Sequence, residues 1–289
     1  MSATILITGA GGQVGHELAQ ANSRHRLVAL TRADLDICDP LLIKAAFERF
    51  NPGLVINAAA YTQVDRAESE PEQAYAINRD AVSHLANACD SRDLPLLHVS
   101  TDYVYSGEGE GDYREDDATD PRSVYGESKA AGDAALRATL ARHIILRTSW
   151  VFSATGNNFV KTMLRLGKER TELGIVDDQQ GCPTSARSIA EVLLHIADRY
   201  LGGESIPWGT YHFCNSPSTS WHDFAAQIFE LAGGYDDLSL RRISTAEYPT
   251  PAVRPMNSTL NCDKLKSNLA IAIPGWQEEL RLVLAQLQA

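Results

Sequence analysis

The sequence predicts an α/β fold: a Rossmann-type, doubly wound parallel sheet joined to a smaller, mixed α/β substrate-binding domain. Three observations predict it. Short apolar runs alternate with helical patterns through the first half of the chain, a glycine-rich turn follows the first run, and the alternation loosens after about residue 150. Apolar strands that alternate with amphipathic helices are typical of a parallel sheet covered on both faces.

Five apolar runs are the expected strands of this sheet. They are TILIT at 4–8, RLVAL at 26–30, LVINAAA at 54–60, LPLLHVS at 94–100 and HIILRTS at 143–149. Helices are expected from near residue 13, at 40–50, at about 71–90 and around Tyr125. Because crossovers between parallel strands are right-handed, these units predict a doubly wound sheet that binds ligands at the carboxyl ends of its strands.

After Trp150 the chain alternates helices with turn-rich connectors such as DDQQGCPTS and AEYPTPAVRP. Helices are expected at 185–200 and 220–231 in this portion. We expect it to interleave with the first. The predicted dinucleotide-binding domain covers 1–149 and about 182–215, and the predicted substrate domain covers about 150–181 and 216–289.

Composition narrows the class of protein. The formal net charge of -11 argues against nucleic acid or an anionic membrane as a partner, although a small phosphorylated ligand is compatible with it. No apolar run is long enough to span a bilayer, and the first residues show no signal-peptide pattern. The five cysteines form no Cys-x-x-Cys pair, and the histidines show no metal-binding spacing. We expect a cytoplasmic protein with reduced thiols and no metal site.

The segment ITGAGGQVG at 7–15 predicts a phosphate-binding turn. Gly9, Gly12 and Gly15 follow the first strand and open a helix. Without a Cβ, this backbone can turn sharply and let a pyrophosphate approach its amides. The helix N-terminus adds free N–H donors and a favourable dipole. The position within a βαβ unit favours a dinucleotide.

The end of the second strand bears on which dinucleotide binds. An acidic residue there accepts the ribose hydroxyls of NAD, whereas an arginine accommodates the 2′-phosphate of NADP. Here Thr31 and Arg32 stand where the acid is expected, and Asp34 and Asp36 follow slightly later. The pattern favours NADPH and leaves NADH open.

Tyr125 and Lys129 are the candidate catalytic pair. Their spacing places both on one face of the same helix. A nearby ammonium helps a tyrosine exchange a proton at neutral pH. Ser100 and Thr101 end the preceding strand, where a hydroxyl can hydrogen-bond a carbonyl oxygen while the tyrosine protonates it. Small residues beside the pair, Gly126, Ala130 and Ala131, indicate a helix packed closely against the cofactor or the sheet.

Together the glycine-rich turn, NAAAYTQVD, STDYVY and YGESK resemble the extended short-chain dehydrogenase/reductase family. Three later segments are similar to those of its sugar-nucleotide ketoreductases: LRTSWVFSATGNNFVKTMLRLGKER, DDQQGCPTS and YPTPAVRPMNSTLNCDKL. The resemblance runs through nearly the whole chain. It implies an oxidoreductase that reduces the C4 keto group of a dTDP-linked sugar with a hydride from NADPH or NADH.

The resemblance also implies roles for individual residues. Tyr125 would protonate the C4 oxygen, Lys129 would hold the nicotinamide ribose and lower the pKa of the tyrosine, and Thr101 would hydrogen-bond the substrate. The implied cofactor-binding residues are Gly9, Gly12, Gln13, Val14, Thr31, Arg32, Asp36, Ile37, Ala60, Tyr61, Thr62, Tyr125 and Lys129. The implied substrate-binding residues are Thr101, Asp102, Tyr103, Trp150 and Asn158.

Some relatives are said to join subunits through magnesium held by acidic side chains. Glu17 matches one such ligand, but Arg187 stands where another is expected. We therefore expect no magnesium-bridged dimer, although a homodimer is one assembly that the resemblance allows.

Three other activities share this scaffold. A dehydratase typically has Thr-Asp-Glu at the strand end, whereas this chain has Thr101, Asp102 and Tyr103. An epimerase would retain its nicotinamide, and the sequence argues less firmly against it. A non-catalytic regulatory subunit, like the one associated with methionine adenosyltransferase, would keep the glycine turn and lose the Tyr-Lys chemistry. The presence of Thr101, Tyr125 and Lys129 favours the reductase.

Overall fold

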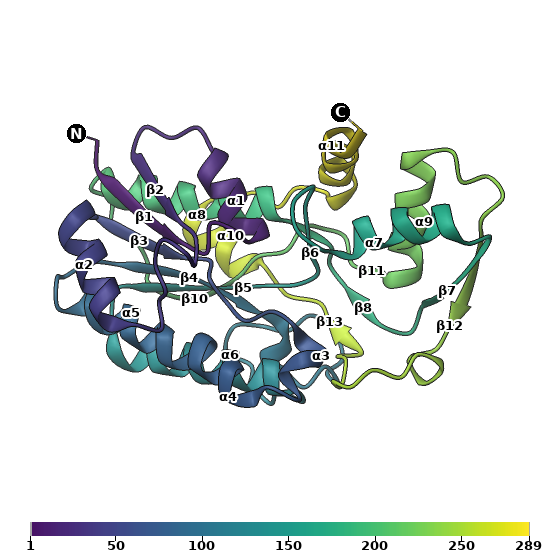
Figure 1. The fold of residues 1–289 in the computed structure, drawn as a ribbon, viewed down its shortest axis with the longest axis horizontal. Helices are drawn as coiled ribbons and strands as arrows, with labels where there is room; N and C mark the ends of the chain where they lie inside the picture. The colour runs from purple at the N-terminus through teal and green to yellow at the C-terminus, as the bar shows by residue number, and fades with distance from the viewer. Residues whose placement is uncertain (1, 289) are drawn as a thin grey trace.

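The computed structural model describes residues 2–288. Its centre is a parallel sheet in the order β10-β5-β4-β3-β1-β2 (Figure 1). The strands are β1 (Thr4–Thr8), β2 (Arg26–Leu30), β3 (Leu54–Asn57), β4 (Leu96–Thr101), β5 (His143–Thr148) and β10 (Gly209–His212). The inner strands β3 and β5 are buried along their whole length, as expected of a sheet covered on both faces.

Helices cover both faces of this sheet. One face packs α1 (Gln13–Gln20), α8 (Ala186–Leu201) and α10 (Asp263–Leu269) against Ile5, Ile7 and Ile144. The other packs α2 (Pro40–Phe50), α5 (Ala81–Asp90) and α6 (Val124–Thr139) against Leu6 and Val55. Three short elements complete this side: α3 (Val64–Ala67), α4 (Pro71–Tyr75) and the 3₁₀ turn η2 (Asp102–Val104).

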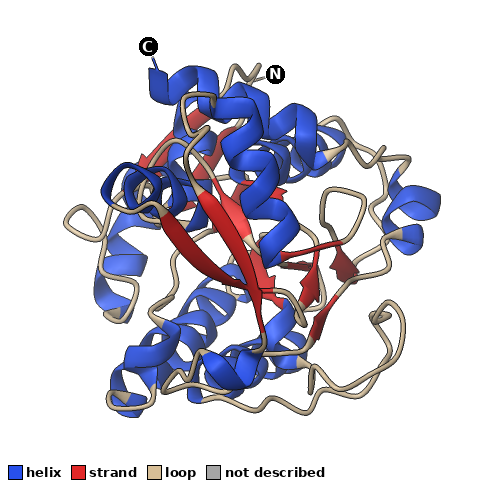
Figure 2. Ribbon diagram, turned by 90° about the vertical axis from the view of Figure 1, so that its right-hand side faces the viewer, coloured by secondary structure: helices blue, strands red, loops and turns tan. Residues whose placement is uncertain are grey.

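The remaining elements form a smaller portion with short strands (Figure 2). Its core is built by α7 (Phe159–Glu169), α9 (Trp221–Ala232) and α11 (Trp276–Gln288), with β7 (Glu172–Val176) paired to β12 (Ser239–Ile243). The other strands have two residues each: β6 (Val151–Phe152), β8 (Gln180–Gly181), β9 (Thr184–Ser185), β11 (Thr219–Ser220) and β13 (Asn257–Ser258). A 3₁₀ turn, η3 (Thr245–Glu247), follows β12.

The predicted fold class is confirmed, and so are the bounds of β1, β2 and α2. The helix expected at about 71–90 differs in one respect. Its middle, η1 (Ala76–Asp80), is a π-helical segment between α4 and α5. Leu265 and Leu269 of α10, placed by sequence in the second portion, pack instead in the core beside the main sheet. The domain boundaries themselves stay a prediction.

The strand order has a switch point between β1 and β3. The chain runs outward from β1 to β2, then returns across β1 to β3 and continues to β4 and β5. Loops that leave β1 and β3 therefore run in opposite directions and open a crevice at the carboxyl ends of the two strands. The glycine-rich turn and residues 58–60 lie at this crevice.

Candidate active site

The glycine-rich turn has the geometry that its sequence predicts. Gly9 has a φ of +77°, and its carbonyl accepts a hydrogen bond from the Gly12 amide at 2.9 Å. A Cβ at Gly9 would lie 2.5 Å from the Ala59 nitrogen, and one at Gly15 would lie 2.1 Å from the Gly9 oxygen. Both positions therefore require glycine. Gly12 caps α1 with no side chain over the helix N-terminus, which leaves its first amides open to an anion.

A cavity of about 220 Å³ lies at the switch point. It is lined by Gly9, Gly11, Gly12, Arg32, Leu35, Asp36, Ile37, Cys38, Ala58, Ala59, Ala60 and Ile77. The lining combines bare backbone from the two loops with mainly apolar side chains and two charged ones, Arg32 and Asp36. This mixture suits an adenosine with its phosphates on the glycine turn.

Of the residues after β2, Thr31 is held by hydrogen bonds within the loop, whereas Arg32 is free to bind a ligand. Thr31 donates its amide and its hydroxyl to the Asp34 carboxylate, at 2.9 and 2.6 Å. Arg32 is exposed, and its guanidinium lies 3.9 Å from the Asp36 carboxylate. A partner this distant and exposed constrains the arginine weakly. Arg32 is thus free to meet an incoming phosphate.

Helix α6 holds Tyr125 and Lys129 through close packing. Ser123 caps it by accepting the Gly126 amide at 3.2 Å. A Cβ at Gly126 would lie 2.2 Å from the Tyr103 oxygen, and one at Gly132 would lie 1.9 Å from the Asn78 oxygen. The close packing expected around Gly126 is present, but its contact is with η2 and not with the sheet. The two glycines bring α6 against η2 and η1.

Tyr125 is buried beside the end of β4. Its ring meets that of Tyr103 edge to face, with centroids 5.4 Å apart. Burial raises the pKa of Tyr125, and the nearby Thr101 hydroxyl partly opposes the rise. The phenol is therefore protonated at neutral pH, with Thr101 beside it.

Lys129 is 1% exposed. Its Nζ donates to the Val99 carbonyl at 2.8 Å and lies 3.1 Å from His98 Nε2. Burial lowers the pKa of Lys129 to about 8. Among the described residues, no hydrogen bond joins Lys129 to Tyr125, and Nζ of Lys129 lies against β4.

Asp102 directly follows the end of β4 and is buried away from solvent. It is 4% exposed, and its Oδ1 accepts the Thr101 hydroxyl at 3.1 Å. Burial raises the pKa of this carboxyl to about 6. Asp102 thus supports the Thr101 hydroxyl in this structure. Its neighbour Tyr103 accepts a hydrogen bond from Arg254 at 3.0 Å, which ties the strand end to the C-terminal part of the chain.

Trp150 follows β5, and its neighbours hold its side chain in one orientation. Its φ is +48°, a left-handed conformation that few non-glycine residues adopt. The ring stacks on Trp221 with centroids 3.5 Å apart. A Cβ at Gly181 would lie 2.3 Å from the Trp150 ring. The stack and the bare Gly181 backbone together fix the orientation of Trp150.

Asn158 and Gln13 lie together, although sequence assigned one to substrate and the other to cofactor. Asn158 donates to Gln13 Oε1 at 2.9 Å and to the Ser153 carbonyl at 2.8 Å, while its own oxygen caps α7. Gln13 Oε1 also accepts the Ser153 hydroxyl at 3.0 Å. These bonds connect the glycine turn to the smaller portion.

The residues after β3 are not all in the cavity. Ala60 lines it. Val14, another predicted cofactor-binding residue, does not line the cavity and is buried at the start of α1. Tyr61 packs in the apolar cluster that contains Tyr125, and its hydroxyl donates to Glu70 at 2.8 Å. Thr62 is exposed.

Sequence reasoning missed several residues of the site. Cavity-lining residues outside the prediction are Gly11, Leu35, Cys38, Ala58, Ala59 and Ile77. Gly11 belongs to the turn that was identified, so its position was a usable signal. Asn57, His98 and Trp221 act through partners distant in sequence, and a single sequence carries no signal for those contacts.

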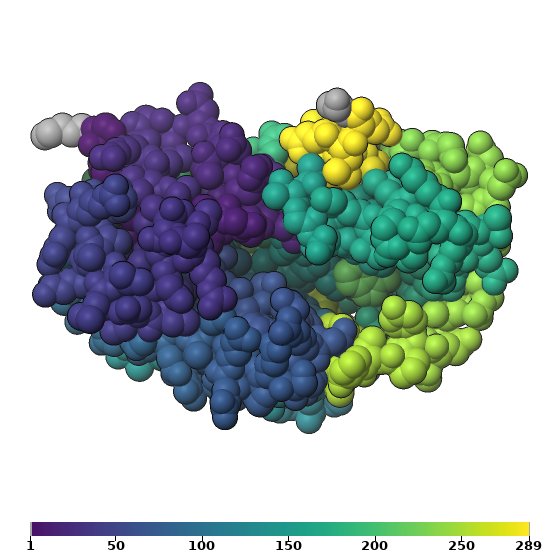
Figure 3. All heavy atoms as spheres, viewed as in Figure 1, coloured from purple at the N-terminus to yellow at the C-terminus, as the bar shows by residue number. Residues whose placement is uncertain are grey.

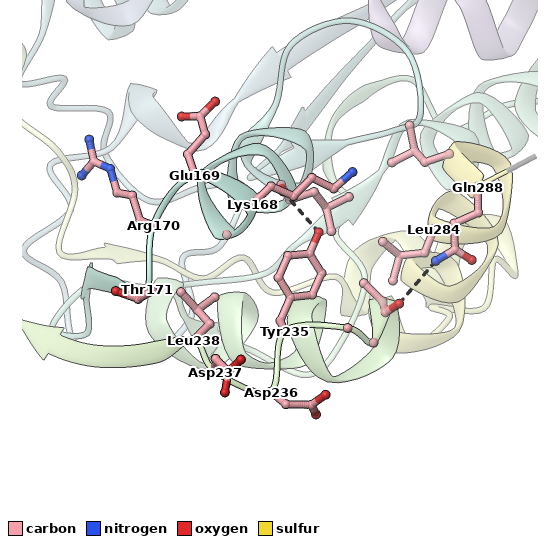
Figure 4. Close-up of a pocket in the computed structure, with 16 residues that line it drawn as sticks. Lys168, Glu169, Arg170, Thr171, Tyr235, Asp236, Asp237, Leu238, Leu284 and Gln288 are labelled. Atoms are coloured by element: carbon pink, nitrogen blue, oxygen red, sulfur yellow. Dashed lines mark hydrogen bonds between the residues drawn. The ribbon is translucent and has the colours of Figure 1, made fainter.

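A second cavity, of about 660 Å³, lies at the far end of the smaller portion (Figure 4). It is open and lies between the ends of α7, α9 and α11, with Lys168, Tyr235 and Asp236 at its wall. None of the predicted site residues lines it. We place the candidate active site at the smaller switch-point cavity, because the phosphate turn lies there. The surface is also hollowed where the purple and blue N-terminal half meets the green C-terminal portion (Figure 3).

Among residues 2–288, one group of side chains has the spacing to hold a metal ion: Asp177, His222 and Asp223. Arg242 pairs with both carboxylates, at 2.5 Å to Asp177 and 2.7 Å to Asp223. A guanidinium therefore already supplies the positive charge. Arg187, the position that departs from the magnesium pattern, donates to Glu191 at 2.9 Å.

Among residues 2–288, none of the helices has the length and apolar character needed to span a membrane.

Residues 3–289 match the family model described as the RmlD substrate binding domain. A dTDP-4-dehydrorhamnose reductase from Aggregatibacter actinomycetemcomitans is 45% identical over 290 residues, which cover 98% of this chain and 99% of that protein.

Solved structures agree. A dTDP-4-dehydrorhamnose reductase from Clostridium acetobutylicum superposes with a TM-score of 0.92 and 37% identity, covering 99% of this chain and 100% of the other. The Bacillus anthracis enzyme of that name, in complex with NADP, superposes with a TM-score of 0.90 and 34% identity, again covering 99% of this chain and 100% of the other.

Proposed function

The chain belongs to the RmlD substrate binding domain family, and on that premise we propose its reaction. It reduces the C4 keto group of dTDP-4-dehydro-β-L-rhamnose to give dTDP-L-rhamnose, the last step in making that nucleotide sugar. The nicotinamide of NADPH supplies the hydride when bound, and NADH is the alternative donor.

The residues of the switch-point cavity fit such a dinucleotide. The bare backbone of Gly9 and Gly12 and the open amides of α1 would hold the pyrophosphate. Asp36 and Ile37 would flank the adenosine. Arg32, exposed and weakly paired, would meet a 2′-phosphate, which supports NADPH over NADH.

Tyr125 would donate the proton to the C4 oxygen. A phenol whose pKa is raised by burial is fully protonated at pH 7, which is the form that reduction consumes. Thr101 would hydrogen-bond the same oxygen and orient it. Lys129 would turn from β4 to the nicotinamide ribose, where its charge would lower the pKa of Tyr125 relative to the cofactor-free state.

The smaller portion would hold the sugar nucleotide. Trp150 presents a flat apolar face, kept in place by Trp221 and Gly181, on which a sugar ring can lie. Tyr103 lies next to Tyr125 and completes the wall at the end of β4. Asn158 would act through Gln13, since their side chains are hydrogen-bonded.

A homodimer stays a prediction, and light scattering of the purified protein can measure the oligomeric state.

The observation that carries the proposal is the placement of buried Tyr125 against the ring of Tyr103, two residues after the Thr101 that ends β4, in a chain similar along its whole length to dTDP-4-dehydrorhamnose reductases. The test is an assay of the purified protein with dTDP-4-dehydro-L-rhamnose and either nicotinamide. We expect one NADPH oxidised per sugar reduced and dTDP-L-rhamnose as the product, with slower turnover of NADH.

Two outcomes would favour other readings. A protein that binds NADPH but reduces no keto sugar would support the regulatory subunit. A protein that interconverts nucleotide sugars without net oxidation of NADPH would support the epimerase.

A further inference from the structure

A chain of buried polar side chains runs from β1 to Lys129 and lies outside the roles assigned above. Thr8 donates its hydroxyl to Asn57 Oδ1 at 2.6 Å. Asn57 Nδ2 lies 3.0 Å from His98 Nδ1, and His98 Nε2 lies 3.1 Å from Lys129 Nζ. Asn57 and His98 are both 0% exposed. Buried polar groups must satisfy one another's hydrogen bonds. The groups at the two ends of this hydrogen-bonded series therefore determine which atom carries each proton.

The backbone fixes the orientation of Asn57. The Ala59 amide donates to Asn57 Oδ1 at 3.1 Å. Rotating the side-chain amide by half a turn would place its NH₂ group against the Ala59 N–H, two donors face to face, at a cost of about 1–3 kcal/mol. The NH₂ group of Asn57 therefore faces His98.

Asn57 in turn fixes the tautomer of His98. Its NH₂ group can only donate, so Nδ1 of His98 must accept and carries no proton. The ring is neutral, because burial lowers its pKa well below the usual value. A neutral ring without a proton on Nδ1 carries it on Nε2, the nitrogen that faces Lys129.

We propose that Asn57 and His98 are positioning residues that present an N–H to Lys129, which stabilises the neutral amine of cofactor-free Lys129 relative to the ammonium. The neutral amine can donate to the Val99 carbonyl and accept from His98 at the same time, whereas an ammonium can only donate. The proposal rests on the proposed function in one respect, that Lys129 becomes an ammonium at the ribose. Binding of NADPH then takes up a proton.

Other groups act on the same nitrogen. Asp133, one turn further along α6, raises the pKa of Lys129 but less than burial lowers it. Asp133 is itself paired with Arg147 of β5 at 3.1 Å. His143 of β5 helps lower the pKa of His98. Tyr125, on the same face of α6, is uncharged.

The first experiment measures the tautomer directly and needs no substrate. Protein labelled with ¹⁵N-histidine is measured without cofactor at pH 9, and the His98 signals are identified by their loss in His98→Gln. We expect the proton on Nε2. In Asn57→Asp the new carboxylate accepts from Nδ1–H, so the proton should move to Nδ1. A wild-type ring protonated on Nδ1 overturns the proposal even if Asn57→Asp fails to fold.

The second experiment measures proton uptake when NADPH binds, by calorimetry in buffers of different ionisation enthalpy. A group with a pKa near 8 is about nine-tenths neutral at pH 9, so uptake should rise from near zero at pH 7 toward one proton at pH 9. The 2′-phosphate is fully ionised at pH 9 and contributes none. In Asn57→Asp, uptake should fall at least threefold at pH 9. Absence of uptake by the wild type would overturn the proposal, whereas failure to reduce a keto sugar would overturn only the proposed function.

Discussion

The main sheet and the smaller portion are ordered by different interactions. In the sheet, parallel ladders of three to six residue pairs hold β1, β3, β4 and β5 in register. In the smaller portion, five of the strands have only two residues each, and aromatic packing positions the binding face, as in the stack of Trp150 on Trp221. On the proposed function, backbone geometry would place the cofactor, whereas individual side chains would place the substrate.

This difference suggests how the two regions divide the reaction. The sheet carries the residues proposed to bind the cofactor and to transfer the proton: the glycine turn, Thr101 and the Tyr-Lys helix. The smaller portion would supply the surfaces that select a particular sugar. Substitutions in the sheet should change cofactor binding and turnover, and substitutions in the smaller portion should change the KM for the sugar.

Tyr125→Phe gives the largest expected effect. The variant keeps the ring and its packing on Tyr103 and loses only the hydroxyl group, and with it the proton donor. The kcat should therefore fall by about 10²–10⁴-fold. The Kd for NADPH should stay within about threefold, because the phenylalanine ring preserves the apolar contacts of the helix. Tyr200→Phe, which loses a hydroxyl bonded to Arg142 far from the site, is the control. Normal turnover by Tyr125→Phe would remove Tyr125 from the mechanism.

Arg32→Ala tests cofactor choice within the sheet half. A charge-assisted hydrogen bond contributes about 1.5–3 kcal/mol, so kcat/KM for NADPH should fall by about 10–100-fold. The value for NADH, which lacks the 2′-phosphate, should be unchanged. An equal loss with both cofactors would show that Arg32 supports the fold and does not read the phosphate.

Gly15→Ala tests whether backbone packing places the cofactor. Its new Cβ would lie 2.1 Å from the Gly9 oxygen, and overpacking of this kind costs about 1–3 kcal/mol. We expect a lower free energy of unfolding and an NADPH Kd raised by about tenfold. Gly11→Ala is the stability control, because its Cβ would meet nothing within 4 Å. Equal stabilities of the two variants would contradict the tight turn.

Trp221→Leu gives the smallest effect and tests the other half of the comparison. An aromatic pair contributes about 0.5–1.5 kcal/mol beyond its buried area, so the KM for the keto sugar should rise by about 2–10-fold. The Kd for NADPH should be unchanged. Trp208→Leu, whose ring packs on Tyr200 beside the main sheet, should leave the sugar KM as it is. A change in NADPH binding alone would reverse the assignment of the two regions.

The same difference explains how much the sequence could predict. Buried parallel strands appear as apolar runs, so β1 and β2 were predicted to the residue, and the glycine turn was recognised by its place after β1. The π segment η1 was missed because its sequence reads as ordinary helix. Trp221 and His98 were missed because their importance comes from Trp150 and Lys129, which lie far away in sequence. Tyr125, Lys129 and Thr101 were named, and their catalytic roles stay predictions.

The most direct test of the central claim follows the hydride. Wild-type protein is mixed with dTDP-4-dehydro-L-rhamnose and NADPH deuterated at both C4 positions of the nicotinamide, and the product is examined by NMR. We expect dTDP-L-rhamnose with one deuterium at C4 of the sugar. Product without deuterium at C4, or deuterium at another carbon, would contradict direct reduction of the C4 keto group.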